Sequence, residues 1–134
     1  MNKAIICSMV LILASSVCCA ADKVTSIPVN FAKGATSALF NGKFKGYDTV
    51  QYTLSATRGQ RMTVQMTGSS NANFNVFAPG DQSGQFSALG SGGAGTDWNG
   101  TLPTSGKYRV QVFQMRASAR RGEVVPYSIS FGIQ

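Results

Sequence analysis

Apolar and polar residues alternate with a period of two along nearly the whole chain after residue 26, and no stretch shows the period of a long helix. Such alternation is typical of strands that bury one face. Eight segments follow it, and their apolar residues in phase are Ile27, Val29 and Phe31; Ala38, Phe40 and Phe44; Val50, Tyr52, Leu54 and Ala56; Met62, Val64 and Met66; Phe74 and Val76; Trp98 and Leu102; Tyr108, Val110 and Val112; and Tyr127, Ile129, Phe131 and Ile133. Because sheets with one apolar face must pack against each other, the pattern predicts an all-β fold: an antiparallel, eight-stranded β-sandwich, jelly-roll-like, in a single domain.

Two glycine-containing stretches test this assignment of strands. Asn41-Gly42 fits a two-residue hairpin turn, but the apolar phase continues from Phe40 to Phe44, which favours a continuous strand. Gly80–Asp97 is rich in Gly and Ser and predicts a long, mobile loop. Within it, Gly90–Gly95 fits the pattern GxGxxG, but it lacks the strand, helix and acidic residue of a nucleotide site. We therefore expect no nucleotide there.

The first twenty residues have the features of a secretory signal peptide. Lys3 forms a basic start, and Ala4–Ala14 is an almost unbroken apolar segment. An apolar segment of about 15 residues is shorter than the roughly 20 that a membrane-spanning helix needs. Small residues then predict cleavage after Ala20 or Ala21. We expect residues 1–20 to be a signal peptide and residues 21–134 to be the exported β-sandwich domain.

All three cysteines, Cys7, Cys18 and Cys19, lie in this signal segment. Neither Cys18 nor Cys19 directly follows a small residue, as a lipid-modified cysteine would, so we expect export without a lipid anchor. The exported domain contains no cysteine, and disulfides therefore cannot stabilise it. Its stability must come from burial of the apolar core.

The composition of the exported domain argues against an enzyme. The chain has no histidine, and Asp and Glu together number only 5. The domain therefore lacks the Ser–His or Cys–His pair of a nucleophilic hydrolase and the Cys and His ligands of a zinc site. We expect neither catalysis nor a metal or other cofactor.

The chain is basic, with Lys+Arg 12 against Asp+Glu 5. Most of the positive charges are scattered along the sequence, which suits a solubilising surface better than a nucleic-acid-binding one.

The exception to this scatter is Met115–Pro126, where Arg116, Arg120 and Arg121 are accompanied by Glu123 alone. A spacing of four predicts that Arg116 and Arg120 lie on the same side of a short helical turn. Arginine binds carboxylates and phosphates through two parallel hydrogen bonds. An unpaired cationic loop of this kind implies an acidic groove as its partner, although solvated loop charges are the commoner case.

Three segments of the chain carry a resemblance to a known family. They are Phe31–Tyr52 (FAKGATSALFNGKFKGYDTVQY), Leu102–Tyr108 (LPTSGKY) and Gln114–Arg120 (QMRASAR). Together they resemble the periplasmic inhibitors of goose-type (g-type) lysozyme, and the likeness runs from about Ile27 to Ile133.

The resemblance implies a periplasmic protein that binds a g-type lysozyme and blocks its acidic active-site cleft, so that the bacterial peptidoglycan is protected. It also implies that the inhibitory surface is formed by loops at one end of the sandwich. Matching motif to motif, Tyr47, Ser105, Arg116 and Arg120 are the expected partner-binding residues. Arg121 is added to them on its spacing alone.

A different class of function also fits a small exported β-sandwich. In a carbohydrate- or peptidoglycan-binding module without inhibitor activity, Tyr47, Trp98 or Phe86 would stack on sugar rings. Such a module binds peptidoglycan in the absence of any lysozyme, whereas a purely structural envelope protein shows neither activity.

Overall fold

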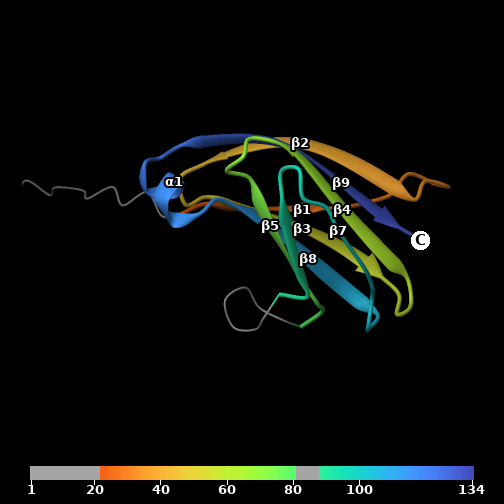
Figure 1. The fold of residues 1–134 in the computed structure, drawn as a ribbon. Coiled ribbons are helices and arrows are strands. Elements are labelled where there is room, and N and C mark those ends of the chain that lie inside the picture. Colours follow the sequence, from red (N-terminus) through yellow and green to blue (C-terminus); the bar gives the residue numbers. More distant parts are fainter. Residues whose placement is uncertain (1–21, 81–87) are drawn as a thin grey trace, which may run out of the picture.

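The computed structural model of the chain describes residues 22–80 and 88–134, and the expected signal peptide lies outside them. Within these residues, nine strands and one short helix form two sheets packed face to face (Figure 1). In chain order the elements are β1 (Val24–Pro28), β2 (Ser37–Lys45), β3 (Thr49–Ala56), β4 (Arg61–Gly68), β5 (Asn73–Phe77), β6 (Gly90–Gly93), β7 (Trp98–Thr101), β8 (Gly106–Phe113), α1 (Arg116–Arg120) and β9 (Val124–Ile133). One sheet has the order β1-β3-β8-β5-β6 and the other β2-β9-β4-β7. The predicted all-β sandwich is confirmed.

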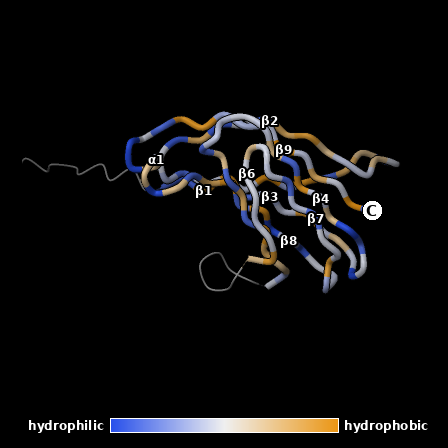
Figure 2. Tube along the Cα trace, in the orientation of Figure 1, coloured by the Kyte–Doolittle hydropathy of each residue, from blue (hydrophilic) through white to orange (hydrophobic). Residues whose placement is uncertain are grey.

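Alternate residues of the long strands form a core between the two sheets. Hydrophobic and hydrophilic residues alternate along these strands (Figure 2), and the hydrophobic ones face inward. On four of the strands the residues predicted from their phase are buried, except Ala56 and Ile133, which are partly buried. The buried ones are Val50, Tyr52 and Leu54 on β3, Met62, Val64 and Met66 on β4, Tyr108, Val110 and Val112 on β8, and Tyr127, Ile129 and Phe131 on β9. Within the described residues, no helix is both long and apolar enough to cross a membrane.

Strand β2 continues through Asn41-Gly42, as the apolar phase predicts. Asn41 pairs with Ser128 and Gly42 with Tyr127 of β9. Glycine is required here for space, because a Cβ added at Gly42 would lie 2.6 Å from the Tyr127 hydroxyl. The turn interpretation of this dipeptide is therefore wrong, and the glycine is a packing residue.

Strand β6 is a ninth strand that the alternation does not predict. It lies in the stretch Gly80–Asp97, which the sequence assigns to a loop, and its four residues pair antiparallel with β5. The loop prediction is wrong for these residues, and residues 81–87 lie outside the described part. A Cβ added at Gly92 would lie 2.5 Å from the Phe74 ring. The aromatic ring fills the space that side chains of β6 would need, so the strand carries no alternation for a sequence pattern to detect.

The first strand differs from prediction in its bounds and direction. It spans Val24–Pro28 rather than Ile27–Phe31, and it pairs parallel with β3, so the sandwich is not wholly antiparallel. The chain leaves β1 for β2 in the opposite sheet and then returns to β3. Because the two paired strands are separated by this excursion, no hairpin forces them to run antiparallel.

A buried hydrogen bond joins the two sheets through the core. The hydroxyl of Tyr52 on β3 lies 2.8 Å from the hydroxyl of Tyr127 on β9. The Tyr52 ring also packs against Phe40 and Phe131, with centroids 5.2 Å away in each case. Burial raises the pKa of both Tyr52 and Tyr127 above the ordinary tyrosine value. The pair is thus held in its neutral, mutually hydrogen-bonded form.

Removing both hydroxyls of this pair should cost less than the sum of the costs of removing each one alone. In Tyr52→Phe or Tyr127→Phe the remaining hydroxyl is buried without its partner, and we expect the free energy of unfolding to fall by about 1–3 kcal/mol. The double variant leaves no unpaired hydroxyl, so its loss should be smaller than the sum of the two single losses. Urea denaturation of the four proteins measures this coupling, and strictly additive losses would contradict it.

The tyrosine pair should also make the fold sensitive to alkali. Tyrosines of the unfolded chain ionise near pH 10, whereas burial keeps the pKa of Tyr52 and Tyr127 higher in the folded state. The folded protein therefore binds more protons than the unfolded chain, and stability falls as the pH rises through about 10. We expect a smaller loss between about pH 9 and 11 for the double Phe variant, measured by urea denaturation at each pH.

Candidate binding site at one end of the sandwich

Helix α1 connects β8 and β9 at one end of the sandwich (Figure 1). Arg116 and Arg120 are its first and last residues, and both are exposed. Their spacing of four places them on the same side, so the predicted helical turn is confirmed. Ser118 and Ala119 of the same helix are buried, and the Ser118 hydroxyl donates to the carbonyl of Met115 at 3.1 Å. The short helix is thus attached by its small residues while its long side chains remain in solvent.

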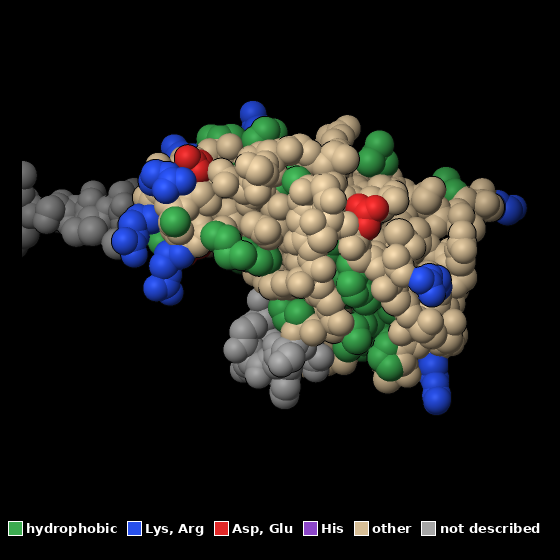
Figure 3. All heavy atoms as spheres, viewed as in Figure 1, with side chains coloured by type: hydrophobic (Ala, Val, Ile, Leu, Met, Phe, Trp, Pro, Cys, Tyr) green, Lys and Arg blue, Asp and Glu red, His purple; other side chains and the backbone are tan. Residues whose placement is uncertain are grey.

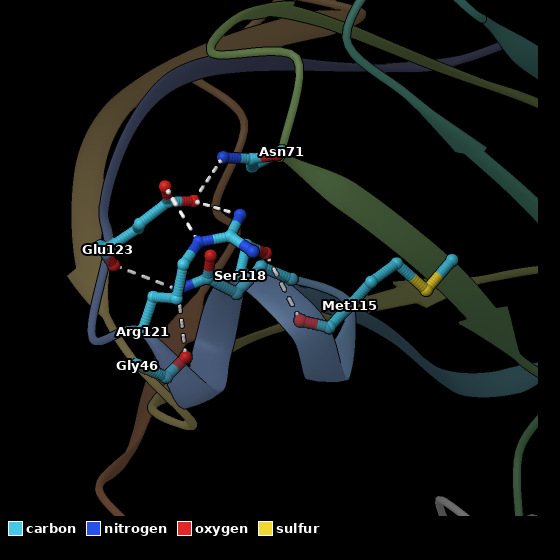
Figure 4. A network of polar contacts seen from close by, with 7 residues as sticks. Gly46, Asn71, Met115, Ser118, Arg121 and Glu123 are labelled. Carbon is cyan, nitrogen blue, oxygen red and sulfur yellow. Dashed lines mark hydrogen bonds and ion pairs between the residues drawn. The ribbon is translucent and has the colours of Figure 1, made fainter.

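The three arginines of this loop differ in their partners. Among the described residues, neither Arg116 nor Arg120 makes a side-chain hydrogen bond or an ion pair. Arg121 donates from Nε and Nη2 to the two carboxylate oxygens of Glu123, each at 3.3 Å (Figure 4). The expectation of three unpaired arginines is therefore wrong for Arg121, because the turn at Gly122 brings Glu123 against it. Two like charges four residues apart disfavour a helix by a few tenths of a kcal/mol, and the fold leaves that repulsion uncompensated.

Tyr47 lies in the turn between β2 and β3. Its side chain is 45% exposed. The preceding Gly46 has a φ of +60°, and its amide donates to the Glu123 carbonyl at 3.1 Å. A Cβ at Gly46 would lie 3.6 Å from the carbonyl oxygen of Ala119. The turn that carries Tyr47 therefore packs directly on the end of α1.

Met115 is a further exposed residue of this end that sequence reasoning missed. It immediately precedes α1 and is 60% exposed. The signal was present, since it is an apolar residue at an outward position of the β8 alternation. Together Tyr47, Met115, Arg116, Arg120 and Arg121 form what we call the cationic end, and Figure 3 shows Lys and Arg side chains gathered there.

Gln114 joins the loops of the cationic end and was also missed. Its side-chain Nε2 donates to the Gly46 carbonyl at 3.0 Å and to the Glu123 carbonyl at 2.8 Å. The Glu123 carboxylate accepts a third contact, from Asn71 Nδ2 at 2.8 Å (Figure 4). Gln114 continues the inward phase of Val110 and Val112, so a polar residue on an apolar phase was the available signal. Three loops are thereby connected through two polar side chains.

Ser105 lies at the opposite end of the sandwich. It precedes β8, and its hydroxyl accepts the amide of Arg58 at 2.8 Å. The β3–β8 pairing runs from Val50–Val112 near the cationic end to Ala56–Gly106 beside Ser105, a separation of about 20 Å at the usual rise of a strand. The expectation that Ser105 shares one end with the other predicted residues is wrong, because the β8 strand lies between it and α1.

The two described aromatic residues of the carbohydrate-binding alternative, Tyr47 and Trp98, lie on different parts of the sandwich. Trp98 is half-buried on β7, at the far edge of the four-stranded sheet from β2. Its ring packs over glycines, since a Cβ at Gly100 would lie 2.9 Å from it. Phe86 lies outside the described residues.

In the part of the chain that the structure describes, no group of His, Cys, Asp and Glu side chains is placed to hold a metal ion. The cationic end offers exposed positive charge together with the exposed apolar side chain of Met115 and the ring of Tyr47.

Comparisons with known proteins give consistent relatives. No family model matches the chain. It is 35% identical over 127 residues to the inhibitor of g-type lysozyme of Escherichia coli (strain K12), covering 94% of this chain and 92% of that protein. Among solved structures, PliG of Aeromonas hydrophila, a periplasmic lysozyme inhibitor of g-type lysozyme, is 62% identical with a TM-score of 0.83, covering 85% of this chain and 100% of the other. Salmonella Typhimurium PliG, also a periplasmic lysozyme inhibitor of g-type lysozyme, is 30% identical with a TM-score of 0.65, covering 82% of this chain and 98% of the other.

The arginines of α1 should contribute nothing to folding. In Arg116→Ala or Arg120→Ala the like-charge repulsion disappears, and we expect the free energy of unfolding to stay the same or rise by about 0.2–0.5 kcal/mol. Arg121→Ala loses an exposed ion pair and should cost less than about 1 kcal/mol. Urea denaturation of the three variants measures these differences. A loss above about 1 kcal/mol in Arg116→Ala would show instead that this residue supports the fold.

Proposed function

Because the chain belongs to the family of periplasmic inhibitors of g-type lysozyme, we propose that it binds a g-type lysozyme in the periplasm and blocks the active-site cleft of that enzyme. It acts by occupying the cleft and not by catalysis. The observation that carries this proposal is the cationic end, where Arg116 and Arg120 have no partner among the described residues and the turn that carries the exposed Tyr47 packs on the end of α1.

The charge of the cationic end suits the chemistry of a glycosidase. Such enzymes cleave sugar chains with a pair of carboxyl groups, one of which protonates the leaving oxygen. A guanidinium that enters the cleft forms a bidentate ion pair with a carboxylate. This pairing favours the deprotonated form of the carboxyl group, which cannot then act as an acid. Arg116 and Arg120 are the residues that we assign to this contact.

The apolar part of the cationic end supplies the anchors of the interface. Tyr47 offers a rigid ring and a hydroxyl, a combination that is enriched at the centres of interfaces. Met115 adds a flexible apolar side chain beside Arg116. In the complex these two side chains exclude water around the arginines, and an ion pair is stronger in such a dry environment.

The other two predicted residues have different roles in this proposal. Arg121 is exposed but paired with Glu123, so its charge contributes to the attraction of an acidic cleft over distance rather than to a buried contact. Ser105 acts within its own turn, where its hydroxyl accepts the Arg58 amide. We expect Ser105→Ala to leave inhibition unchanged.

Substitution of the contact residues should abolish inhibition while the fold persists. Truncating one member of a desolvated Arg–carboxylate pair costs about 2–5 kcal/mol of binding energy, which weakens affinity roughly 30-fold or more. We expect this loss for Arg116→Ala and for Arg120→Ala, and a loss of at least about tenfold for Tyr47→Ala. The measurement is inhibition of peptidoglycan lysis by g-type, hen-type and invertebrate-type lysozymes, with only the g-type enzyme expected to be inhibited.

Arg58→Ala is the matched control, because Arg58 is an exposed arginine on a turn at the opposite end of the sandwich. Equal inhibition by Arg58→Ala and by Arg116→Ala would reject the assignment of the contact surface. Failure of the unchanged protein to inhibit any g-type lysozyme would reject the function itself. Binding to purified sacculi without lysozyme would support the carbohydrate-binding alternative.

A further inference from the structure

We propose that Gln114 is a positioning residue that holds Tyr47 and the arginines of α1 in the one arrangement that fits the lysozyme cleft. The inference rests on the proposed function, since it names the group that organises the same surface. Gln114 touches no partner in this proposal. It acts through the two loops that carry the contact residues.

The geometry places Gln114 at the junction of these loops. It follows the end of β8 and is only 7% exposed. Its Nε2 donates one hydrogen to the carbonyl of Gly46, the residue before Tyr47, and the other to the carbonyl of Glu123, the residue that closes the α1 loop. The two carbonyls belong to segments 77 residues apart in the sequence, and a single amide group connects them. The orientation of the amide is determined, because only the nitrogen can donate to two carbonyls.

The choice of glutamine is costly to the fold. Tyr108, Val110 and Val112 precede it on the same inward phase, where an apolar residue would be the stable choice. The Gln114 Oε1 is buried and has no hydrogen-bond partner in the part of the chain that the structure describes. A buried acceptor without a partner destabilises a protein. A methionine has nearly the same shape and would remove that defect. What glutamine supplies, and methionine lacks, is the pair of donors that the Gly46 and Glu123 carbonyls accept.

Those bonds arrange the cationic end. The Glu123 backbone, which Gln114 and the Gly46 amide both contact, also positions a carboxylate that binds Asn71 and Arg121. Glu123 thus pairs with Arg121, while Arg116 and Arg120 have no partner in the described part of the chain. A surface that is ordered before binding avoids the entropy cost of ordering loops in the complex. Without the Gln114 bonds, the loops must be ordered during binding, and the entropy cost should then weaken affinity. The core should stay intact.

The test is Gln114→Met, which removes both hydrogen bonds at nearly constant volume. By amide hydrogen exchange in the free protein, we expect the Gly46 and Glu123 amides to exchange at least about tenfold faster, with core amides of β3 and β9 unchanged. The thermal midpoint should shift by no more than a few degrees. Affinity for the g-type lysozyme should fall about tenfold. In a Tyr47→Ala/Arg120→Ala background, where two of the three positioned groups are absent, the same substitution should change affinity less than twofold.

Gln65→Met is the matched control, because Gln65 lies on the exposed face of β4 and donates one side-chain hydrogen bond, to Asp97. It should leave loop exchange and lysozyme affinity unchanged. Unchanged exchange at Gly46 and Glu123 in Gln114→Met would overturn the proposal, as would an affinity loss that persists in full in the Tyr47→Ala/Arg120→Ala background. The exchange measurement needs no lysozyme. If the unchanged protein failed to bind a g-type lysozyme, the proposed function would fail, and the proposal about the contact surface with it, whatever the exchange result.

Discussion

The burial of one alternating face from each of two sheets is the constraint on which the rest of the structure depends. The exported domain has no cysteine to link its strands, so the packing of β3, β4, β8 and β9 must hold the sandwich together. The Tyr52–Tyr127 hydrogen bond crosses between the sheets inside this core. Because close-packed sheets deform little, the loops at their ends are presented from a rigid base.

That rigid base explains how a small, non-enzymatic domain can hold the loops of the cationic end in one arrangement. At the cationic end the short α1 is tied to the β2–β3 turn through Gln114, and to the segment carrying Asn71 through Glu123. Charge and polarity there are arranged at a cost to folding: two unpaired arginines lie on one helix face, and one buried acceptor has no partner among the described residues. Such local costs are expected where a surface serves a partner rather than the fold.

Much of the fold follows from the alternation, because one-sided burial leaves a direct period-two signal. It predicted the sandwich, the continuous β2 through Gly42 and nearly every inward residue. It could not predict β6, whose glycines carry no side chains to alternate, nor the parallel pairing of β1, since strand direction depends on which sheet the chain visits next. For the site, the spacing of four predicted the α1 turn. The spacing could not predict the Arg121–Glu123 ion pair, because the conformation of the turn at Gly122 decides which side chain Arg121 contacts.

The sequence by itself determined the kind of chain: an all-β domain without histidine or cysteine, a cationic loop, and a family likeness carried by short motifs. These are properties of residue type and spacing, which are local. The tertiary structure alone decided which distant residues meet. It packed the turn that carries Tyr47 against α1 and placed Ser105 at the other end of the same strand pair. It also joined the Gly46 and Glu123 carbonyls through the side-chain amide of Gln114. Register and sheet order set these meetings, and both arise from packing of the whole core.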